Sequence, residues 1–174
     1  MKKMTEIRCN SNDPLFDKTN MLKKEFPSDW RRIRYFTLLI VQSAPFQGEE
    51  MAILEQQVCE IIKNAIKHGN KCDLTKKITV YYSFSSSHAH LIVEDEGEGF
   101  KELEKWNEFN KNRRRALEAN DLKVLADYVS FKTEESASDD GGNALFAALE
   151  FWNEGIAFNE KRNSIAMYKT YPQK

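Results

Sequence analysis

The sequence predicts an α+β fold, because patterns typical of helices and patterns typical of antiparallel strands occur in separate blocks along the chain. Apolar residues recur at three- and four-residue spacing from Met51 to Ile66, as on one face of a helix. Alternation at 78–84 and again at 91–93, with serines between, predicts a β-hairpin. A second block of helix and hairpin is predicted at 143–152, 155–159 and 164–170.

Composition and charge indicate one globular domain without a strong overall field. The 174 residues are 41% hydrophobic and 30% charged, and 26 basic residues balance 27 acidic ones. This balance argues against nonspecific attraction to nucleic acid or to an anionic membrane surface. No apolar stretch is long enough to cross a bilayer, and the three cysteines lack metal-type spacing. We expect a cytoplasmic protein with reduced thiols.

The chain begins with an arm that is followed by two helices. Residues 1–26 mix polar side chains with little periodicity, which predicts an extended N-terminal arm. Ser28 or Asp29 is a suitable N-cap for the first helix. The second helix is predicted from about 49 to 68, and Gly69 is placed to end it as a C-cap.

The middle of the chain departs from these regular patterns. From about 101 to 138, charged residues alternate with scattered aromatic ones, and one helix is predicted near 117–129. The segment reads as a mobile cover over a site. The three arginines that follow Asn112, at 113–115, are either a phosphate clamp or a solvated face. His88 and His90, beside the hairpin turn, are predicted to be surface residues.

Glu60 and Asn64 form the first group of residues that suggests chemistry. They are four residues apart, so on a helix both project from the same face, beside the apolar stripe. An asparagine carbonyl oxygen is a hard neutral ligand for Mg²⁺, and a carboxylate one turn away can accept a proton from an attacking hydroxyl. A solvated Glu-Asn pair is also common on helix surfaces, so this pair alone does not distinguish a catalytic site from an ordinary polar surface.

A second group follows a predicted strand directly. Asp95, Gly97 and Gly99 occupy alternate positions there. The glycines permit backbone angles and a close ligand approach that a Cβ atom would obstruct. An aspartate at a strand end can accept a hydrogen bond from an exocyclic amine, such as that of adenine. An ordinary acidic β-turn is the alternative interpretation.

A third group precedes the last predicted helix. It consists of Gly141, Gly142, Asn143 and Ala144. A glycine-rich entry exposes backbone N–H groups at the positive end of the helix dipole, which favours phosphate. The alternative interpretation of these residues is an ordinary flexible loop followed by an N-cap. The order of the three groups along the chain is more specific than any one of them.

With these groups in this order, the chain resembles the histidine-kinase-like (GHKL) ATPase superfamily over about 27–169. Within it, the chain is similar to the anti-sigma-factor serine/threonine kinases of bacterial partner-switching systems. The resemblance implies a two-layer α/β sandwich, with helices on one face of a mixed, mostly antiparallel sheet. It also implies that 27–174 form an ATP-binding domain, with a lid insertion at about 101–138, that uses ATP and Mg²⁺.

The resemblance implies roles for individual residues as well. Glu60 would be the general base, Asn64 the Mg²⁺ ligand, and Asp95 the acceptor for the adenine amino group. Further nucleotide contacts would come from His68, Gly97, Gly99, Gly141, Gly142, Asn143, Ala144 and Ser164. His68 is equally explained by the dipole at a helix C-terminus. Ala144 stands where the family usually has a glycine, and its methyl group would either crowd the phosphates or stiffen the helix start.

Two function hypotheses follow from the resemblance. In the first, the protein is an anti-sigma-type regulator that phosphorylates a serine or threonine of a small antagonist (anti-anti-sigma) protein and otherwise binds a sigma factor. In the alternative, it senses nucleotide and changes protein partners without phosphoryl transfer. Both imply a protein partner rather than nucleic acid or a membrane. The resemblance also implies a homodimer built from the arm and the helix near 30–41.

Overall fold

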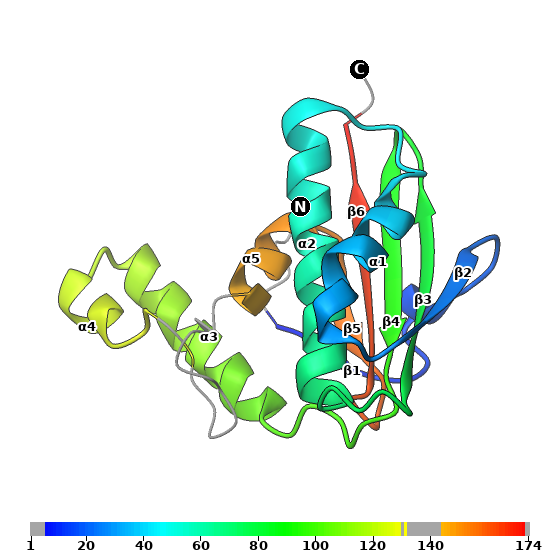
Figure 1. The fold of residues 1–174 in the computed structure, drawn as a ribbon. Helices are drawn as coiled ribbons and strands as arrows, with labels where there is room; N and C mark the ends of the chain where they lie inside the picture. The colour runs from blue at the N-terminus through cyan, green and yellow to red at the C-terminus, as the bar shows by residue number, and fades with distance from the viewer. Residues whose placement is uncertain (1–5, 130, 132–143, 173–174) are drawn as a thin grey trace.

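The computed structural model describes residues 6–129, 131 and 144–172, which contain an open sheet with helices on one face (Figure 1). The strands are β1 (Arg8–Cys9), β2 (Leu22–Pro27), β3 (Lys77–Phe84), β4 (His88–Glu94), β5 (Gly155–Phe158) and β6 (Ser164–Thr170). They form a six-stranded sheet in the order β1-β5-β6-β4-β3-β2. Among these described strands, β1 and β5 form the parallel pair and all other neighbours are antiparallel. The sheet is therefore mixed and mostly antiparallel, as expected.

Helices form the second layer and a projecting lobe. The layer contains α1 (Ile33–Val41), α2 (Gly48–Asn64) and α5 (Ala144–Phe151), and the lobe contains α3 (Leu103–Glu118) and α4 (Leu122–Ala126) (Figure 1). Short turns are η1 (Pro14–Phe16), η2 (Trp30–Arg32) and the π-helical turn η3 (Ala65–Gly69). None of the helices in the described ranges is long and apolar enough to cross a membrane.

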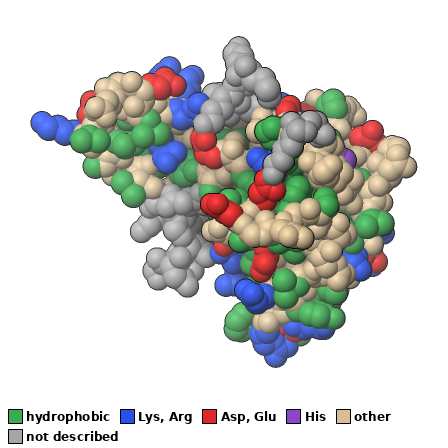
Figure 2. All heavy atoms as spheres, turned by 90° about the horizontal axis from the view of Figure 1, so that it is seen from above, with side chains coloured by type: hydrophobic (Ala, Val, Ile, Leu, Met, Phe, Trp, Pro, Cys, Tyr) green, Lys and Arg blue, Asp and Glu red, His purple; other side chains and the backbone are tan. Residues whose placement is uncertain are grey.

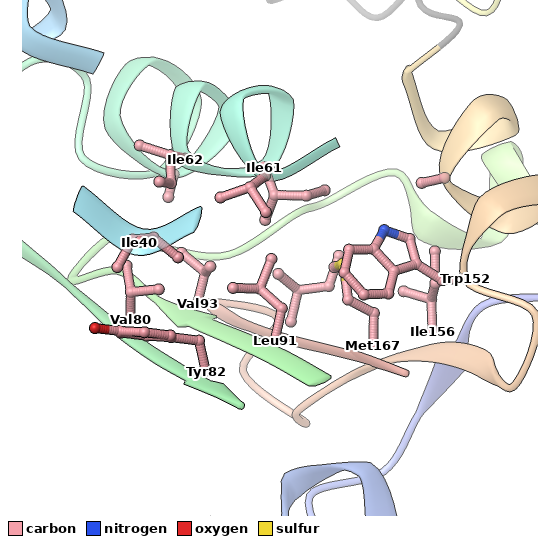
Figure 3. Close-up of a cluster of buried hydrophobic side chains, with 14 of the residues drawn as sticks. Ile40, Ile61, Ile62, Val80, Tyr82, Leu91, Val93, Trp152, Ile156 and Met167 are labelled. Carbon is pink, nitrogen blue, oxygen red and sulfur yellow. The ribbon is translucent and has the colours of Figure 1, made fainter. Parts of the chain in front are cut away.

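The core lies between the sheet and the helix layer (Figure 3). The apolar faces of α1 and α2 pack on every second residue of the central strands. The three- and four-residue spacing of the helices and the two-residue alternation of the strands therefore bury their apolar residues at one interface. The buried side chains at this interface include Ile40, Ile61, Ile62, Val80, Leu91, Val93, Ile156 and Met167. Each such burial contributes about 1.5–3 kcal/mol. This packing fixes the rotation of α2 and hence the position of its polar face.

The lobe is where the predicted secondary structure is wrong. A helix was expected near 117–129, but α3 begins at Leu103 and a separate short helix, α4, follows. Asp121 is the N-cap of α4, because its side chain accepts hydrogen bonds from the backbone N–H groups of Lys123 and Val124, both at 3.1 Å. The buried positions of α3 include Leu103, Trp106 and an asparagine, separated by many charged residues. This thin apolar stripe hides the helical period.

The N-terminal arm covers the face of the sheet that the helices leave open. Residues 22–27 are themselves an edge strand, paired antiparallel with β3. Upstream, the carbonyl oxygen of Leu15 accepts a hydrogen bond from Nε2 of His90 at 2.7 Å. His90 is consequently 9% exposed, and burial lowers the pKa of its imidazole. The prediction of a surface His90 was wrong, because hairpin alternation does not reveal what covers the second face.

Candidate functional site

The polar face of α2 carries Glu60 and Asn64 one turn apart, and both side chains are half-buried. The Glu60 carboxylate forms an ion pair with Lys63 in which Nζ and Oε2 are 2.7 Å apart. After Asn64 the helix widens into the π-helical turn η3, whose closing bond runs from the N–H of Asn70 to the carbonyl of Ala65 at 2.8 Å. Single π-helical turns are frequent at functional sites, where they re-aim the residues that flank them.

Asn70 connects the end of this helix to the loop after β4. Its side chain donates to Ser28 Oγ at 2.9 Å and to the Lys77 carbonyl at 3.0 Å, and Oδ1 accepts from the N–H of Glu96 at 2.7 Å. Asn70 is 1% exposed, so these bonds are made in a buried position. The sequence analysis did not single out this residue, although an asparagine directly after a C-cap glycine was the available signal.

Asp95 lies at the end of β4, directly against the turn that ends α2. Its own N–H donates to the carbonyl of Asn163 at 2.8 Å, and its Oδ1 accepts from the N–H of Gly97 at 2.8 Å. A Cβ atom at Gly69 would lie 2.4 Å from Cγ of Asp95, so only glycine fits there. Burial is the main cause that raises the pKa of the Asp95 carboxyl to about 6. The carboxylate is thus confined and partly desolvated.

Two glycines after Asp95 let neighbouring loops approach closely. A Cβ atom at Gly97 would lie 2.1 Å from the carbonyl oxygen of Gly69. At Gly99 the backbone has φ +90°, and a Cβ atom would lie 1.9 Å from the carbonyl oxygen of Lys161. The glycines therefore shape this region through contacts between loops of the chain itself.

Ser164 begins β6 and is paired in register with Glu94, the residue before Asp95. It is 6% exposed, and its Oγ has no hydrogen-bond partner among the described residues. Buried hydroxyl groups are normally hydrogen-bonded, so one without a protein partner can form its hydrogen bond with a ligand or a water molecule. In the described part of the chain, Oδ2 of Asp95 also accepts no hydrogen bond from a protein donor. The pairing with Glu94 puts Ser164 on the face of the sheet that Glu94 occupies, whereas the next residue, Asp95, lies against Gly69 of η3.

These residues fit an adenine nucleotide. The carboxylate of Asp95 can accept a hydrogen bond from an exocyclic amine, and the hydroxyl of Ser164, at the same end of the sheet, can donate or accept one. For Mg²⁺ the fit is looser, because the described residues contain no cluster of three or more His, Cys, Asp or Glu side chains suited to a metal ion. Mg²⁺ usually takes only one or two protein ligands and completes its shell with phosphate and water oxygens, so Asn64 suffices for such a site.

The remaining predicted residues are placed at the same end of α2 or near α5. His68 is exposed in η3, and Ala144 is the first residue of α5. Gly141, Gly142 and Asn143 lie outside the described residues. The structure thus brings Asp95 and Gly97 against η3, whereas Gly99 lies against the β5–β6 turn and Ser164 begins β6 opposite Glu94.

The projecting lobe borders α5. A hollow of about 150 Å³ lies between α3 and α5 and is lined in part by Arg113, Arg114 and Phe146. The Arg113 guanidinium lies over the Phe146 ring, 4.6 Å from its centroid. Figure 2 shows the lobe projecting from the body with both basic and hydrophobic side chains at its surface. A shallower hollow of about 400 Å³ lies on the other sheet face, between the arm and β6, and contains none of the predicted site residues.

Comparison with known proteins agrees with this arrangement. A family model described as the histidine kinase-like ATPase domain matches residues 26–169. Proteins named anti-sigma F factor from strains of Clostridium perfringens, among them SM101 and ATCC 13124, are 35% identical to the chain over 60 residues. That match covers 34% of this chain and 43% of each relative. Because the family model spans most of the sequence, the chain belongs to the histidine kinase-like ATPase domain family.

Proposed function

We propose that the protein binds ATP with Mg²⁺ at the end of the sheet where β4 and β6 meet the C-terminal turn of α2. The observation that carries this proposal is the Asp95 carboxylate, which is confined against η3 and whose Oδ2 accepts no hydrogen bond from the described residues. Gly69 and Gly97 leave no room for side chains around that carboxylate. The fixed surroundings favour recognition of a planar base with a single orientation of its amine.

Each half of the site has its own task in this proposal. Asp95 accepts a hydrogen bond from the adenine amine, and Ser164, at the same end of the sheet, supplies a second polar contact. Asn64, the last residue of α2, offers its side-chain oxygen to Mg²⁺. ATP with Mg²⁺ supplies the transferable phosphoryl group. Glu60, one turn from Asn64, accepts the proton of an attacking hydroxyl group.

Calorimetry tests nucleotide binding directly. Mg-ATP and Mg-ADP are titrated into the wild-type protein, Asn64→Ala and Gln56→Ala. Gln56 is exposed on the same helix, which makes it a matched control for helix stability. We expect Mg-dependent binding that Asn64→Ala loses by at least about tenfold and that Gln56→Ala retains. Equal Mg-dependent affinities for wild type and Asn64→Ala would contradict the assignment of Asn64.

We further propose that this ATP site serves a serine/threonine kinase of the anti-sigma type. The support is the relatives named anti-sigma F factor, together with the Glu60 and Asn64 spacing on a half-buried helix face. The substrate is a small antagonist (anti-anti-sigma) protein, and the other partner is a sigma factor. The catalytic assignment is tested with radiolabelled ATP and purified antagonist proteins. Glu60→Gln should slow transfer about 100-fold or more, whereas Glu55→Gln, also on α2, should not.

One observation favours the second function, a nucleotide-sensing module without phosphoryl transfer. The carboxylate proposed as the base is engaged by Lys63 at 2.7 Å, and it must leave that ion pair to accept a proton. Tight binding of nucleotide and antagonist with no transfer by wild type would favour this function. If Lys63→Gln then allowed transfer, the ion pair would be identified as the block. Rapid transfer by wild type would exclude the sensing module.

A homodimer is the third part of the proposal. The outer face of η2 and α1 exposes Trp30, Tyr35 and Leu38, which are 56%, 51% and 41% accessible. Large apolar side chains gathered on one surface are typical of protein contacts. Light scattering at micromolar concentration should give a mass near 40 kDa, about twice the 20.3 kDa of one chain. Tyr35→Glu should shift it to the monomer, and a wild-type monomer at all concentrations would contradict the proposal.

A further inference from the structure

We infer that Asn159 is a positioning residue for the proposed adenine site. Its side chain shapes the β5–β6 turn (159–163), and that turn holds the Asp95 loop (95–100) in place. The inference rests on the proposed function and adds a residue that acts through Asp95 rather than on the nucleotide itself. Asn159 directly follows β5 and belongs to none of the three residue groups on which the family resemblance rests.

Backbone carbonyl groups of the β5–β6 turn contact both ends of the Asp95 loop, and the two segments lie side by side at one end of the sheet (Figure 1). The carbonyl oxygen of Asn163 accepts a hydrogen bond from the N–H of Asp95 at 2.8 Å. That of Arg162 accepts from the N–H of Phe100 at 2.9 Å. The carbonyl oxygen before it lies against Gly99. The shape of the turn therefore determines where the backbone of Asp95 lies.

Asn159 uses each of its polar groups within this part of the chain. Its Oδ1 accepts hydrogen bonds from the N–H groups of Asn163 at 3.0 Å and Ser164 at 3.1 Å. Its Nδ2 donates to Oδ1 of Asn163 at 2.9 Å. Its backbone N–H donates to the Ser164 carbonyl at 3.0 Å, and its carbonyl accepts from the N–H of Arg162 at 2.9 Å. The side chain thus reaches across the turn and fixes the residue whose carbonyl holds Asp95.

The turn depends on this side chain because its own backbone is strained. Arg162 has φ +59°, a left-handed conformation that a residue other than glycine adopts only at a cost in free energy. Among the described residues, the side chains that bind the turn from outside are those of Cys9, Ser11 and Glu104, all in exposed contacts. Water competes with such contacts, which weakens them. The half-buried amide of Asn159 is therefore the main side-chain restraint on the turn.

Asn153 is a matched control at the opposite end of the same two strands. Its Oδ1 accepts from the N–H of Thr170 at 2.9 Å, and its Nδ2 donates to the carbonyl of the same residue at 3.1 Å. Like Asn159 it joins the β5 side to β6 through a side-chain amide, but it precedes β5 instead of following it. Asn153→Ala therefore removes comparable hydrogen bonds without touching the β5–β6 turn.

Calorimetry with two nucleotides distinguishes positioning of Asp95 from a general loss of stability. Mg-ATP is compared with the Mg²⁺ complex of purine riboside triphosphate, which lacks the exocyclic amine. Wild type should bind ATP roughly 10 to 100 times more tightly than this analogue, as expected for one hydrogen bond to a charged acceptor. In Asn159→Ala this affinity ratio should fall about fourfold or more, because the carboxylate is no longer held opposite the amine. Asn153→Ala should keep the wild-type ratio.

Two further variants sharpen the measurement. Asn159→Asp keeps the acceptor, and the Asn163 amide can turn its NH₂ group toward the new carboxylate, so this variant should preserve the wild-type ratio. Asn163→Ala removes only the contact with Nδ2 and should lower the ratio about two- to threefold, which keeps the inference testable if Asn159→Ala does not fold.

Amide hydrogen exchange without nucleotide reports on the loop independently of binding. The N–H of Asp95 should exchange at least about tenfold faster in Asn159→Ala than in wild type, because its acceptor on the turn is no longer fixed. It should exchange at the wild-type rate in Asn153→Ala and in Asn159→Asp. An unchanged rate in Asn159→Ala would overturn the inference.

The binding outcomes separate this inference from the proposed function. A wild-type affinity ratio in folded Asn159→Ala would overturn the positioning role while leaving the nucleotide site intact. An equal fall in Asn153→Ala would also overturn it, because general destabilisation would then explain both variants. If wild type bound ATP and the analogue equally, or bound neither, the proposed contact between Asp95 and the amine would fail, and the role of Asn159 would fail with it.

Discussion

Asn70 and Asn107 perform the same task in two regions of the molecule, yet their surroundings differ. Each uses its side-chain amide to join segments that are distant in sequence. Asn70 is almost fully buried and makes three hydrogen bonds to the residues around the Asp95 loop. Asn107 is half-buried and makes two hydrogen bonds, both to Ile7 of the arm.

This difference divides the molecule into a fixed side, around Asp95, and an adjustable side, the lobe of α3 and α4. Around Asp95, glycines pack backbone against backbone and buried hydrogen bonds leave little freedom. The lobe of α3 and α4 has a thin apolar stripe, and exposed apolar side chains such as Leu122, which is 72% accessible. Regions with few buried contacts open at lower free energy than the global unfolding transition. The surroundings of Asp95 are therefore expected to keep one geometry, whereas the lobe is expected to open more readily.

Gly99→Ala should have the largest effect on stability, because it adds an atom where two loops of the fixed side are in close contact. The new Cβ atom would meet the Lys161 carbonyl at 1.9 Å in a backbone with φ +90°. We expect a loss of about 3 kcal/mol or more in the free energy of unfolding, measured by urea denaturation. Gly48→Ala is the control, since Gly48 has φ +58° but open space around it, and it should lose only about 1–2 kcal/mol. Equal losses would contradict close packing at Gly99.

The stabilities of Asn70→Ala and Asn107→Ala, measured side by side, test the comparison itself. Removing Asn70 leaves the Glu96 N–H and the Lys77 carbonyl without their partner in a buried position. We expect a loss of roughly 2–4 kcal/mol in the free energy of unfolding. Asn107→Ala should lose under about 1 kcal/mol, because its contact lies in a half-buried position. If both variants lost the same amount, the division into a fixed and an adjustable side would be wrong.

The buried Asp95 carboxyl should make the free energy of unfolding depend on pH, and Asp95→Asn tests this. The carboxyl has a pKa of about 6 in the folded protein against 3.8 as its reference value, so the native state binds the proton more tightly. Its contribution to stability is present below about pH 4 and is lost as the pH rises through about 6. Allowing for partial exposure, we expect about 1–2 kcal/mol over this range.

In Asp95→Asn that pH dependence should disappear, and the variant should unfold at higher urea concentration than wild type at pH 8. ATP affinity should fall about tenfold or more at the same pH, because the ionised acceptor for the adenine amine is lost. Denaturation at pH 4.5 and pH 8, with calorimetry at pH 8, measures both. Wild-type ATP affinity in the variant would remove Asp95 from the site.

Ser164→Ala should give the smallest and most diagnostic change. The hydroxyl is buried without a partner in the described chain, so its removal should leave the free energy of unfolding unchanged or raise it by up to about 1 kcal/mol. ATP affinity should nevertheless fall about fivefold, which corresponds to one neutral hydrogen bond. Measurement of both quantities in one preparation distinguishes a ligand contact from a packing residue. Destabilisation with unchanged affinity would identify a packing role.

Much of the fold follows from local patterns, whereas the connections around the site do not. The stripe from Met51 to Ile66 and the alternation in both hairpins predicted the core, because each element buries one face at its own period. Asn70 was missed because its value depends on three partners brought together only by folding. The burial of His90 was missed for the same reason, since Leu15 reaches it across 75 positions of sequence.

The glycines illustrate the same limit within the site. Their spacing after Asp95 was read from the sequence as room for a ligand, and the structure adds the contacts with Gly69 and Lys161 that require them. Pattern alone identified the positions, but close approach between loops is a property of the assembled chain. α3 was predicted incorrectly because its buried residues, including Asn110, are too few and too polar to show a helical period.

The most direct test of the account is an amide NMR titration of the wild-type protein with Mg-ATP. The account predicts saturable shifts concentrated at Asn64, Asp95, Gly97 and Ser164, which lie around one end of the sheet. It predicts no saturable shifts around Arg8 and Tyr168, which line the hollow on the opposite face. Shifts confined to that hollow, or no saturable shifts at all, would contradict a nucleotide site at the Asp95 end of the sheet.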